Sequence, residues 1–385
     1  MRAVAVFPAE RALRLVDAPE PAIQAPAQVR LRVRDVGVCG TDREIARFEY
    51  GTGPAGLDHL ILGHECLAEV VETGSEVSQL EPGDLVVPSV RRPCPHPRCR
   101  PCRVDRQDFC STGDFSERGI KGLGGYMTEW IVEDARYLQA VPAELDEVAV
   151  LVEPLTIAEK ALAQIWEVQE RLPWECRHPW KGQRFRTSPQ PSGECHRAVV
   201  LGAGPVGLLG TMALIEAGFE TAVYSRELEA GPKARLVESL GARYISAETR
   251  SIGELSGELG SIDVVYEAAG ASKPAFELLK ELGPNGIFVF TGVPGRKAPI
   301  ELDADHVMRR LVLLNQVVLG TVNAGPLSFA QAVKDLQSFM RRWPVSVRAL
   351  ISGRHPLEAA EGLLREPPPG IKHVISLRSQ GFARE

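Results

Sequence analysis

The chain has no long block of like charge, no internal repeat and no general excess of basic residues. It contains 385 residues with a formal net charge of -6 at pH 7, and acidic and basic side chains are mixed along it. Nucleic acids and anionic membrane surfaces attract clustered Lys and Arg, so we expect neither as a partner. The hydrophobic content of 44% predicts a globular protein with a large core, and the length predicts two or three domains.

Export and membrane signals are also lacking. The first fifteen residues include Arg2, Glu10 and Arg11, which leave no room for the apolar core of a secretory signal. Residues 198–215 are uncharged and long enough for a membrane span, but glycine and proline interrupt their first half. We therefore expect no membrane segment and a cytoplasmic location. In a reducing compartment, the eight cysteines favour metal binding or catalysis over disulfides.

Two kinds of pattern follow one another along the chain. Up to about residue 142, short alternating runs such as 29–33 predict a β-rich, barrel-like or sandwich-like domain. From residue 197, strands alternate with helices, which predicts a doubly wound parallel sheet and so an α/β fold with its ligand at the carboxyl ends of the strands. The strands are predicted at 198–201, 221–224, 262–266 and 286–290, with helices to 217 and at 230–240 and 274–282. A helix at 328–341 and a strand at 373–377 follow.

A glycine-rich turn follows the first strand of the parallel sheet. Gly202-Ala203-Gly204-Pro205-Val206-Gly207 fits G-x-G-x-x-G and opens a helix, the context that predicts dinucleotide binding. The first glycine permits a tight turn, the second lets the pyrophosphate approach, and the third lets helix and strand pack closely. The next strand ends in Ser225-Arg226-Glu227. Ser225 and Arg226 favour the 2′-phosphate of NADP, whereas Glu227, one place late, leaves NAD as the alternative.

Four cysteines lie close together in the sequence. Cys94, Cys99, Cys102 and Cys110 provide four thiols, the ligand set of a closed structural zinc site. His96 in the first gap leaves open a set of three cysteines and one histidine, and two disulfides are the rival interpretation.

A second set is dispersed: Cys39, His64, Glu65 and Glu153. A thiolate, an imidazole and a carboxylate would hold zinc with one position open, as catalytic zinc sites do. Spacing alone does not show that these four residues meet.

Together these features resemble the zinc-dependent medium-chain dehydrogenases/reductases, and within them the glucose 1-dehydrogenase branch. The resemblance rests on Cys39-Gly-Thr-Asp-Arg-Glu-Ile, Gly63-His64-Glu65, Arg106-Gln-Asp-Phe-Cys110, Val152-Glu-Pro-Leu-Thr156, the glycine-rich turn and Gly320-Thr-Val-Asn323. It implies a GroES-like catalytic domain at 1–195 and 324–385, with a structural-zinc lobe at 90–112 and an insertion at 166–196. A Rossmann domain would occupy 196–323. The implied reaction oxidises the C1 hydroxyl of an aldose to a lactone, with hydride passed to NADP or NAD.

The resemblance also assigns roles by position. Cys39 and His64 would bind catalytic zinc, with Glu65 and Glu153 as ligands or exchanging through water, and the proton would leave through Thr41, Glu65 or Glu153. Sugar hydroxyls would be bound by Thr41, Glu117, Glu153 and Asn323. The cofactor would be lined by Gly202, Gly204, Pro205, Val206, Gly207, Ser225, Arg226, Thr291, Gly292, Val293, Thr321, Val322, Asn323 and Lys372. Two zinc ions per chain and a homodimer or homotetramer would follow.

Some features depart from the branch or have no assigned role. Ile157 and Leu313 stand where some members have polar substrate-binding groups, which leaves the particular sugar open. The rival functions are a zinc polyol, threonine or alcohol dehydrogenase and a non-catalytic nucleotide-binding protein. We expect residues 311–314 to be core and the tryptophans of the insertion, Trp166, Trp174 and Trp180, to anchor it. Cys66, Cys176 and Cys195 are expected to be plain thiols.

Overall fold

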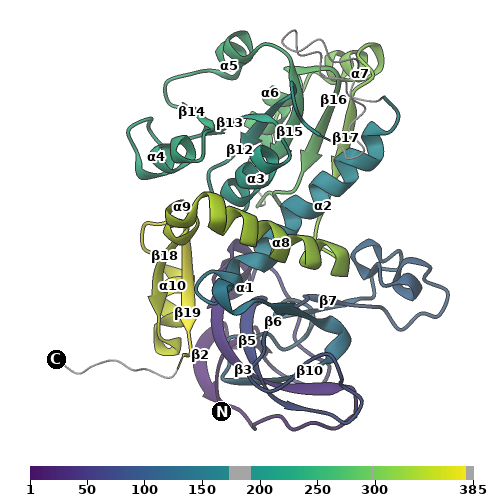
Figure 1. Cartoon of the computed structure of the whole chain (residues 1–385), viewed down its shortest axis with the longest axis vertical. Coiled ribbons are helices and arrows are strands. Elements are labelled where there is room, and N and C mark those ends of the chain that lie inside the picture. Colours follow the sequence, from purple (N-terminus) through teal and green to yellow (C-terminus); the bar gives the residue numbers. More distant parts are fainter. Residues whose placement is uncertain (173–191, 296–298, 379–385) are drawn as a thin grey trace. The chain divides into compact units, whose positions relative to one another are not determined.

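The structure is a computed structural model that describes residues 1–172, 192–295 and 299–378. The chain forms two compact units (Figure 1). The first unit contains Met1–Thr156 and Asn323–Glu385, and the second contains Ile157–Val322.

The first unit is built on a mostly antiparallel sheet centred on β3 (Gln28–Gly37). Val29, Leu31 and Val33 are fully buried, as the alternating pattern predicts. In Figure 1 the purple N-terminal strands lie beside the yellow C-terminal ones, because β19 (Lys372–Ser376) pairs with β3. The other strands of this sheet are β5 (Glu65–Thr73), β6 (Leu85–Pro88), β10 (Trp130–Asp134), β11 (Leu138–Val141) and β18 (Ile351–His355).

Smaller elements complete the first unit. One three-stranded sheet contains β1 (Arg2–Phe7), β2 (Ala12–Asp17) and β4 (Leu60–Ile61). A second contains β7 (Arg91–Arg92), β8 (Ser116–Arg118) and β9 (Gly122–Leu123). Its helices are α1 (Gly40–Ala46), the first residues of α2 (Val152–Gln169), α8 (Pro326–Arg342), α9 (Pro344–Ala349) and α10 (Ala360–Arg365).

The second unit contains a six-stranded parallel sheet in the order β14-β13-β12-β15-β16-β17. Its strands are β12 (Arg197–Leu201), β13 (Glu220–Ser225), β14 (Arg243–Ser246), β15 (Ile262–Glu267), β16 (Leu282–Phe290) and β17 (Val317–Gly320). The helices are α3 (Pro205–Glu216), α4 (Pro232–Ser239), α5 (Ile252–Leu259), α6 (Ser272–Leu279) and α7 (Ala304–Leu313). The chain adds strands on one side of β12 and then on the other, so a topological switch point lies beside β12. The α/β fold class is confirmed.

The boundary between the units lies earlier than the sequence predicts, at Thr156 rather than residue 195. The reason is α2, whose later turns pack within the second unit. Trp166 stacks on Phe219 with ring centroids 5.6 Å apart, and Lys160 Nζ donates to the Val322 carbonyl at 3.0 Å. Trp174, Trp180 and most of the 166–196 insertion lie outside the described residues.

The expectation that residues 311–314 form core is wrong. Val312 and Leu313 are 74% and 62% exposed, and α7 buries none of its residues. The uncharged stretch 198–215 divides into β12, the glycine-rich turn and α3. No helix among the described residues is long and apolar enough to cross a membrane.

Candidate active site

Three of the dispersed candidate ligands meet in the first unit. The ligand atoms of Cys39, His64 and Glu65 all lie within 4.8 Å of one another. Cys39 is the N-cap of α1, and Glu65 begins β5 opposite Gly37 of β3. Gly37 is required here, because a Cβ at this position would lie 2.0 Å from Glu65 Oε2. A thiolate, an imidazole and a carboxylate in this arrangement suit zinc with one position left for substrate.

Asp42 orients two of these groups. Its Oδ2 accepts a hydrogen bond from the Cys39 backbone N–H at 2.9 Å, and its Oδ1 lies 3.2 Å from His64 Nδ1. The Asp42 side chain is fully buried, so it fixes the His64 ring with Nε2 left for a metal. Asp42 is absent from the residues that the sequence singles out. Its signal was a carboxylate three residues after a helix N-cap, the spacing of a capping box.

Glu65 is paired with Lys372 in the interior. Lys372 Nζ lies 2.7 Å from Oε1 and 2.5 Å from Oε2 of Glu65, and the two residues are only 2% and 1% exposed. The sequence predicts that Lys372 contacts the nucleotide. In the structure its ammonium neutralises Glu65, and the nucleotide contact stays a prediction.

Glu153, the second residue of α2, lies outside the 4.8 Å group. Burial raises its pKa to about 7, while His64 and Lys372 act to lower it. A zinc ion nearby would favour the carboxylate further, because a cation stabilises the charged form. The geometry therefore favours Glu65 as the carboxylate ligand and leaves Glu153 as a buried group able to exchange a proton near neutral pH.

These groups predict the pH dependence of stability in zinc-free protein. Folding raises the pKa of Glu153 from 4.5 to about 7. Burial opposes protonation of His64, yet Asp42 raises its pKa well above 6.5. Both shifts mean that the folded state binds a proton more tightly than the unfolded state. The contribution of Glu153 to folding stability is therefore fully present below pH 4.5 and is lost as the pH rises through about 7. His64 loses its contribution at higher pH.

Urea unfolding across this range, compared between zinc-free wild type and Glu153→Gln, isolates the Glu153 contribution. The wild type should lose stability more steeply than the variant between pH 4.5 and 7. Parallel curves would show that Glu153 is not held in its protonated form.

The predicted sugar-binding residues Glu117 and Asn323 also meet. Asn323 Nδ2 donates to Glu117 Oε1 at 3.0 Å across a sequence separation of 206 residues. Arg91, which the sequence does not single out, donates from Nε to the same oxygen at 3.0 Å and holds the Glu117 side chain in place. Thr41 is half-buried in the first turn of α1.

The lobe cysteines converge as the spacing predicts. The Sγ atoms of all four lie within 4.8 Å of one another, namely those of Cys94, Cys99, Cys102 and Cys110. His96 is not part of this group, because its half-exposed ring pairs with Asp114 at 2.8 Å. All four lobe cysteines are free thiols, which argues against the disulfide interpretation and favours a zinc site with four thiolate ligands.

The cysteines without an assigned role differ among themselves. Cys66 is a buried free thiol on β5. Cys195 is disulfide-bonded, so the expectation of a plain thiol is wrong there. Cys176 lies outside the described residues.

In the second unit, the glycine-rich turn has the geometry that each glycine predicts. Gly202 has a φ of 105°, and Gly204 is the N-cap of α3 with open space where a Cβ would stand. A Cβ on Gly207 would lie 2.0 Å from the Gly202 carbonyl oxygen. The N-terminus of α3 therefore presents backbone N–H groups to an anion. Thr291, Gly292, Val293, Thr321 and Val322 follow the carboxyl ends of β16 and β17.

The end of β13 distinguishes the two dinucleotides. Ser225 Oγ accepts from the Ala203 N–H at 3.3 Å, and Arg226 is exposed. Glu227 is engaged elsewhere, because its Oε1 accepts the Lys233 N–H at 2.9 Å in the first turn of α4. This arrangement favours a 2′-phosphate over a ribose hydroxyl that needs a carboxylate.

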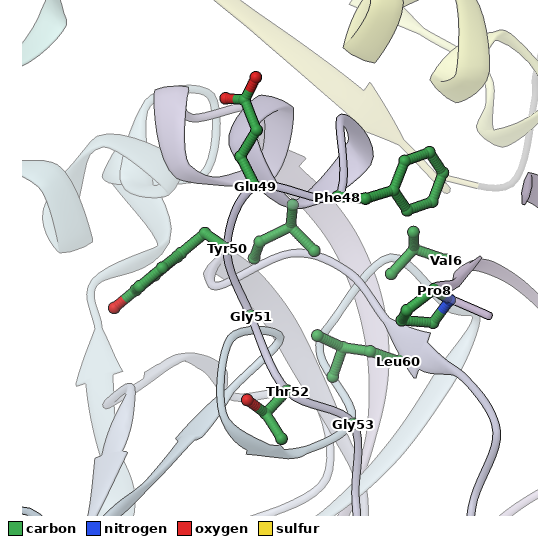
Figure 2. A pocket seen from close by; sticks show the side chains of 10 residues that line it. Val6, Pro8, Phe48, Glu49, Tyr50, Gly51, Thr52, Gly53 and Leu60 are labelled. Carbon is green, nitrogen blue, oxygen red and sulfur yellow. The ribbon is translucent and has the colours of Figure 1, made fainter. Parts of the chain in front are cut away.

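A separate cavity of the first unit contains none of the predicted site residues. Figure 2 shows Tyr50 directed away from Phe48 on the segment that borders it. The cavity is lined by Val6, Pro8, Ile45, Phe48, Glu49, Tyr50, Gly51, Thr52, Gly53 and Leu60. Two of these residues, Gly51 and Thr52, lie against the turn that follows Glu117. The Thr52 N–H donates to the Ile120 carbonyl of that turn at 2.9 Å.

Comparison with known proteins agrees with this geometry. Residues 182–377 match the glucose dehydrogenase C-terminus family, and residues 25–143 match the alcohol dehydrogenase GroES-like domain. A glucose 1-dehydrogenase of Methanocella arvoryzae is 36% identical over 98% of this chain and 99% of its own length. The chain belongs to the zinc-dependent glucose 1-dehydrogenase family. A second family member, from Thermoproteus tenax, is 40% identical over 98% of this chain and all of its own length.

A solved structure of this family has the same fold. The glucose dehydrogenase of Haloferax mediterranei, in complex with NADP, Zn and gluconolactone, is 30% identical and aligns with a TM-score of 0.84. The alignment covers 99% of this chain and 100% of that one. Family membership confirms the resemblance drawn from the sequence motifs.

Proposed function

We propose that this protein oxidises the C1 hydroxyl of a glucose-like aldose to its lactone and passes the hydride to NADP. One observation carries the proposal: a zinc-type donor set and a polar Glu117–Asn323 pair occur in the same unit of a glucose 1-dehydrogenase family member. The relative from Haloferax mediterranei was solved with NADP, Zn and gluconolactone. We assign one catalytic zinc to Cys39, His64 and Glu65, and one structural zinc to the lobe.

The chemistry follows from the side chains of the first unit. Zinc, when bound, polarises the C1 hydroxyl and lowers its pKa. Glu117, fixed by Arg91, accepts hydrogen bonds from sugar hydroxyls, and Asn323 can donate to them. The hydroxyl proton would leave through Thr41 or through a carboxylate, Glu65 or Glu153, and burial raises the pKa of Glu153 to about 7. Bound NADP would accept the hydride from C1, which would leave the sugar as a lactone.

The use of NADP predicts the effect of Arg226→Ala. Loss of a guanidinium partner for the 2′-phosphate should raise KM for NADP about tenfold, because an exposed charge-assisted hydrogen bond is worth about 1.5 kcal/mol. KM for NAD should change little. Arg243→Ala is the matched control, because Arg243 begins β14 at the opposite end of the sheet and pairs with Glu258. An equal rise in KM for both cofactors would contradict the assignment.

A substrate panel separates this function from its rivals. NADP reduction would be followed with aldoses, polyols and simple alcohols in zinc-replete protein. Reduction of NADP with D-glucose or a near epimer supports the proposal. Activity with polyols or alcohols alone would show that the substrate is a polyol or alcohol and not an aldose. Ile157 is half-buried at the start of the second unit and Leu313 is exposed there, so neither provides a polar group for the sugar. About one zinc ion per chain without activity would favour the non-catalytic protein.

We further propose a homodimer or homotetramer in the cytoplasm. The side chains of Met308, Val312 and Leu313 are apolar and exposed on α7, the helix that precedes the outer strand β17, and exposed apolar side chains are typical of a protein interface. Light scattering of the purified protein measures the oligomer directly. The cytoplasmic location is supported by the four lobe thiols, which a reducing compartment keeps available for zinc.

A further inference from the structure

A buried carboxylate at the carboxyl end of β15 takes no part in the proposed reaction. Glu267 is 1% exposed, and within the described part of the chain its side chain accepts hydrogen bonds only from backbone N–H groups. Oε1 accepts from Ala269 at 2.8 Å and Gly270 at 2.7 Å, and Oε2 accepts from Gly292 at 3.2 Å. One carboxylate thus joins the loop after β15 to the loop after β16.

The two loops are packed as closely as glycine allows. A Cβ on Gly292 would lie 2.2 Å from the Gly270 nitrogen and 2.8 Å from Glu267 Oε2. Gly270 has a φ of 59°, in the left-handed region. A Cβ on Gly202 would lie 3.0 Å from the Ala269 Cβ, so the glycine-rich turn also touches the loop after β15. Three loops at the carboxyl ends of neighbouring strands therefore meet around Glu267.

The sheet topology shows which part of a dinucleotide these loops would receive. The strand order reverses beside β12, with β13 and β14 on one side and β15, β16 and β17 on the other. A dinucleotide lies across such a switch point with one half on each side. Ser225 and Arg226 at the end of β13 suit the adenosine half and its 2′-phosphate. The nicotinamide half then lies over the ends of β15 and β16, where the loops joined by Glu267 are found.

Burying a carboxylate costs desolvation free energy, which hydrogen bonds from neighbouring donors must offset. Burial raises the pKa of Glu267, and the backbone N–H groups of both loops oppose that rise. An apolar side chain would pack at lower cost but could not accept three N–H groups from two loops. We propose that Glu267 is a positioning residue that holds residues 268–270 and 291–293 in the shape that receives the nicotinamide half of NADP. The inference rests on the proposed use of NADP.

The test compares a whole cofactor with its adenosine half. Glu267→Gln replaces one acceptor oxygen with an NH2 group that faces an N–H donor, so at least one loop is released. Calorimetry of the full chain should show the Kd for NADP raised about tenfold or more, and the Kd for 2′,5′-ADP changed by less than about twofold. Glu254→Gln is the matched control, since Glu254 accepts two hydrogen bonds from Ser251 at the exposed start of α5. It should leave both constants unchanged.

Each outcome decides between the interpretations. An unchanged Kd for NADP, or equal weakening of NADP and 2′,5′-ADP, overturns the positioning role, because a general loss of structure affects both ligands. If Glu267→Gln does not fold, Glu267→Asp carries the same test, since it keeps the charge but shortens the reach to Gly292. Failure of the wild type to bind NADP would instead refute the proposed function, and this inference with it.

Discussion

Replacing His64 with alanine is expected to lower kcat/KM for the sugar by about a thousandfold or more. Lewis-acid stabilisation by zinc is worth several kcal/mol, and each 1.36 kcal/mol is a factor of about ten in rate. His64 is 5% exposed and oriented by Asp42, so no other side chain takes its place. Steady-state kinetics and zinc analysis measure both consequences, with zinc expected to fall from about two ions per chain to about one. Binding of NADP should be retained, since most of the residues predicted to line it, from Gly202 to Val322, lie in the second unit.

The control for this experiment is another histidine of the same unit. His96 lies in the lobe and pairs with Asp114 on the surface, outside both groups of candidate ligands. His96→Ala should therefore keep full activity and both zinc ions. If His64→Ala keeps normal turnover after losing one zinc, the metal has no part in the reaction.

The second large effect concerns stability. Lys372→Met should lower the free energy of unfolding of zinc-free protein by about 3–5 kcal/mol, because it leaves the Glu65 carboxylate buried without its cation. The side chains of Lys372 and Glu65 are 3% and 1% exposed, so water cannot replace the lost partner. Urea unfolding measures the loss. The loss should be smaller in zinc-loaded protein, where the metal supplies a positive charge near Glu65.

A double-mutant cycle shows whether the pair itself is responsible. Combining Lys372→Met with Glu65→Gln removes both charges and should recover a large part of the stability lost by Lys372→Met alone. Lys121→Met is the control, since Lys121 Nζ donates to the Gly113 carbonyl and lies over the Phe115 ring but forms no ion pair with a buried carboxylate among the described contacts. Additive losses in the double variant would show that the two charges do not stabilise one another.

The sequence predicts those features whose cause is local. The alternation at 29–33 gives β3, and the apolar runs at 198–201 and 262–266 give β12 and β15. The glycine-rich turn is predictable because its three glycines recur at a fixed spacing between a strand and a helix, within one short segment. The four lobe cysteines are predictable for the same reason, since they lie in one short segment.

Features that depend on distant contacts could not be predicted. Arg91 and Asp42 matter because of the groups that the fold brings to them, and nothing in their own sequence neighbourhoods names Glu117 or His64 as partner. Residues 312 and 313 are apolar, as core residues are, but apolar character does not show whether other parts of the same chain bury them. The boundary at Thr156 depends on which sheet the later turns of α2 pack against. A helical pattern alone does not contain that information.

The most direct test of the account measures NADP reduction with D-glucose before and after removal of zinc. We predict reduction of NADP accompanied by lactone formation in zinc-replete protein, loss of the activity after chelation of the catalytic zinc, and its return when zinc is added. Undiminished reduction after both zinc ions are removed, or no reduction of NADP or NAD by any aldose in protein that holds two zinc ions, would contradict the central claim.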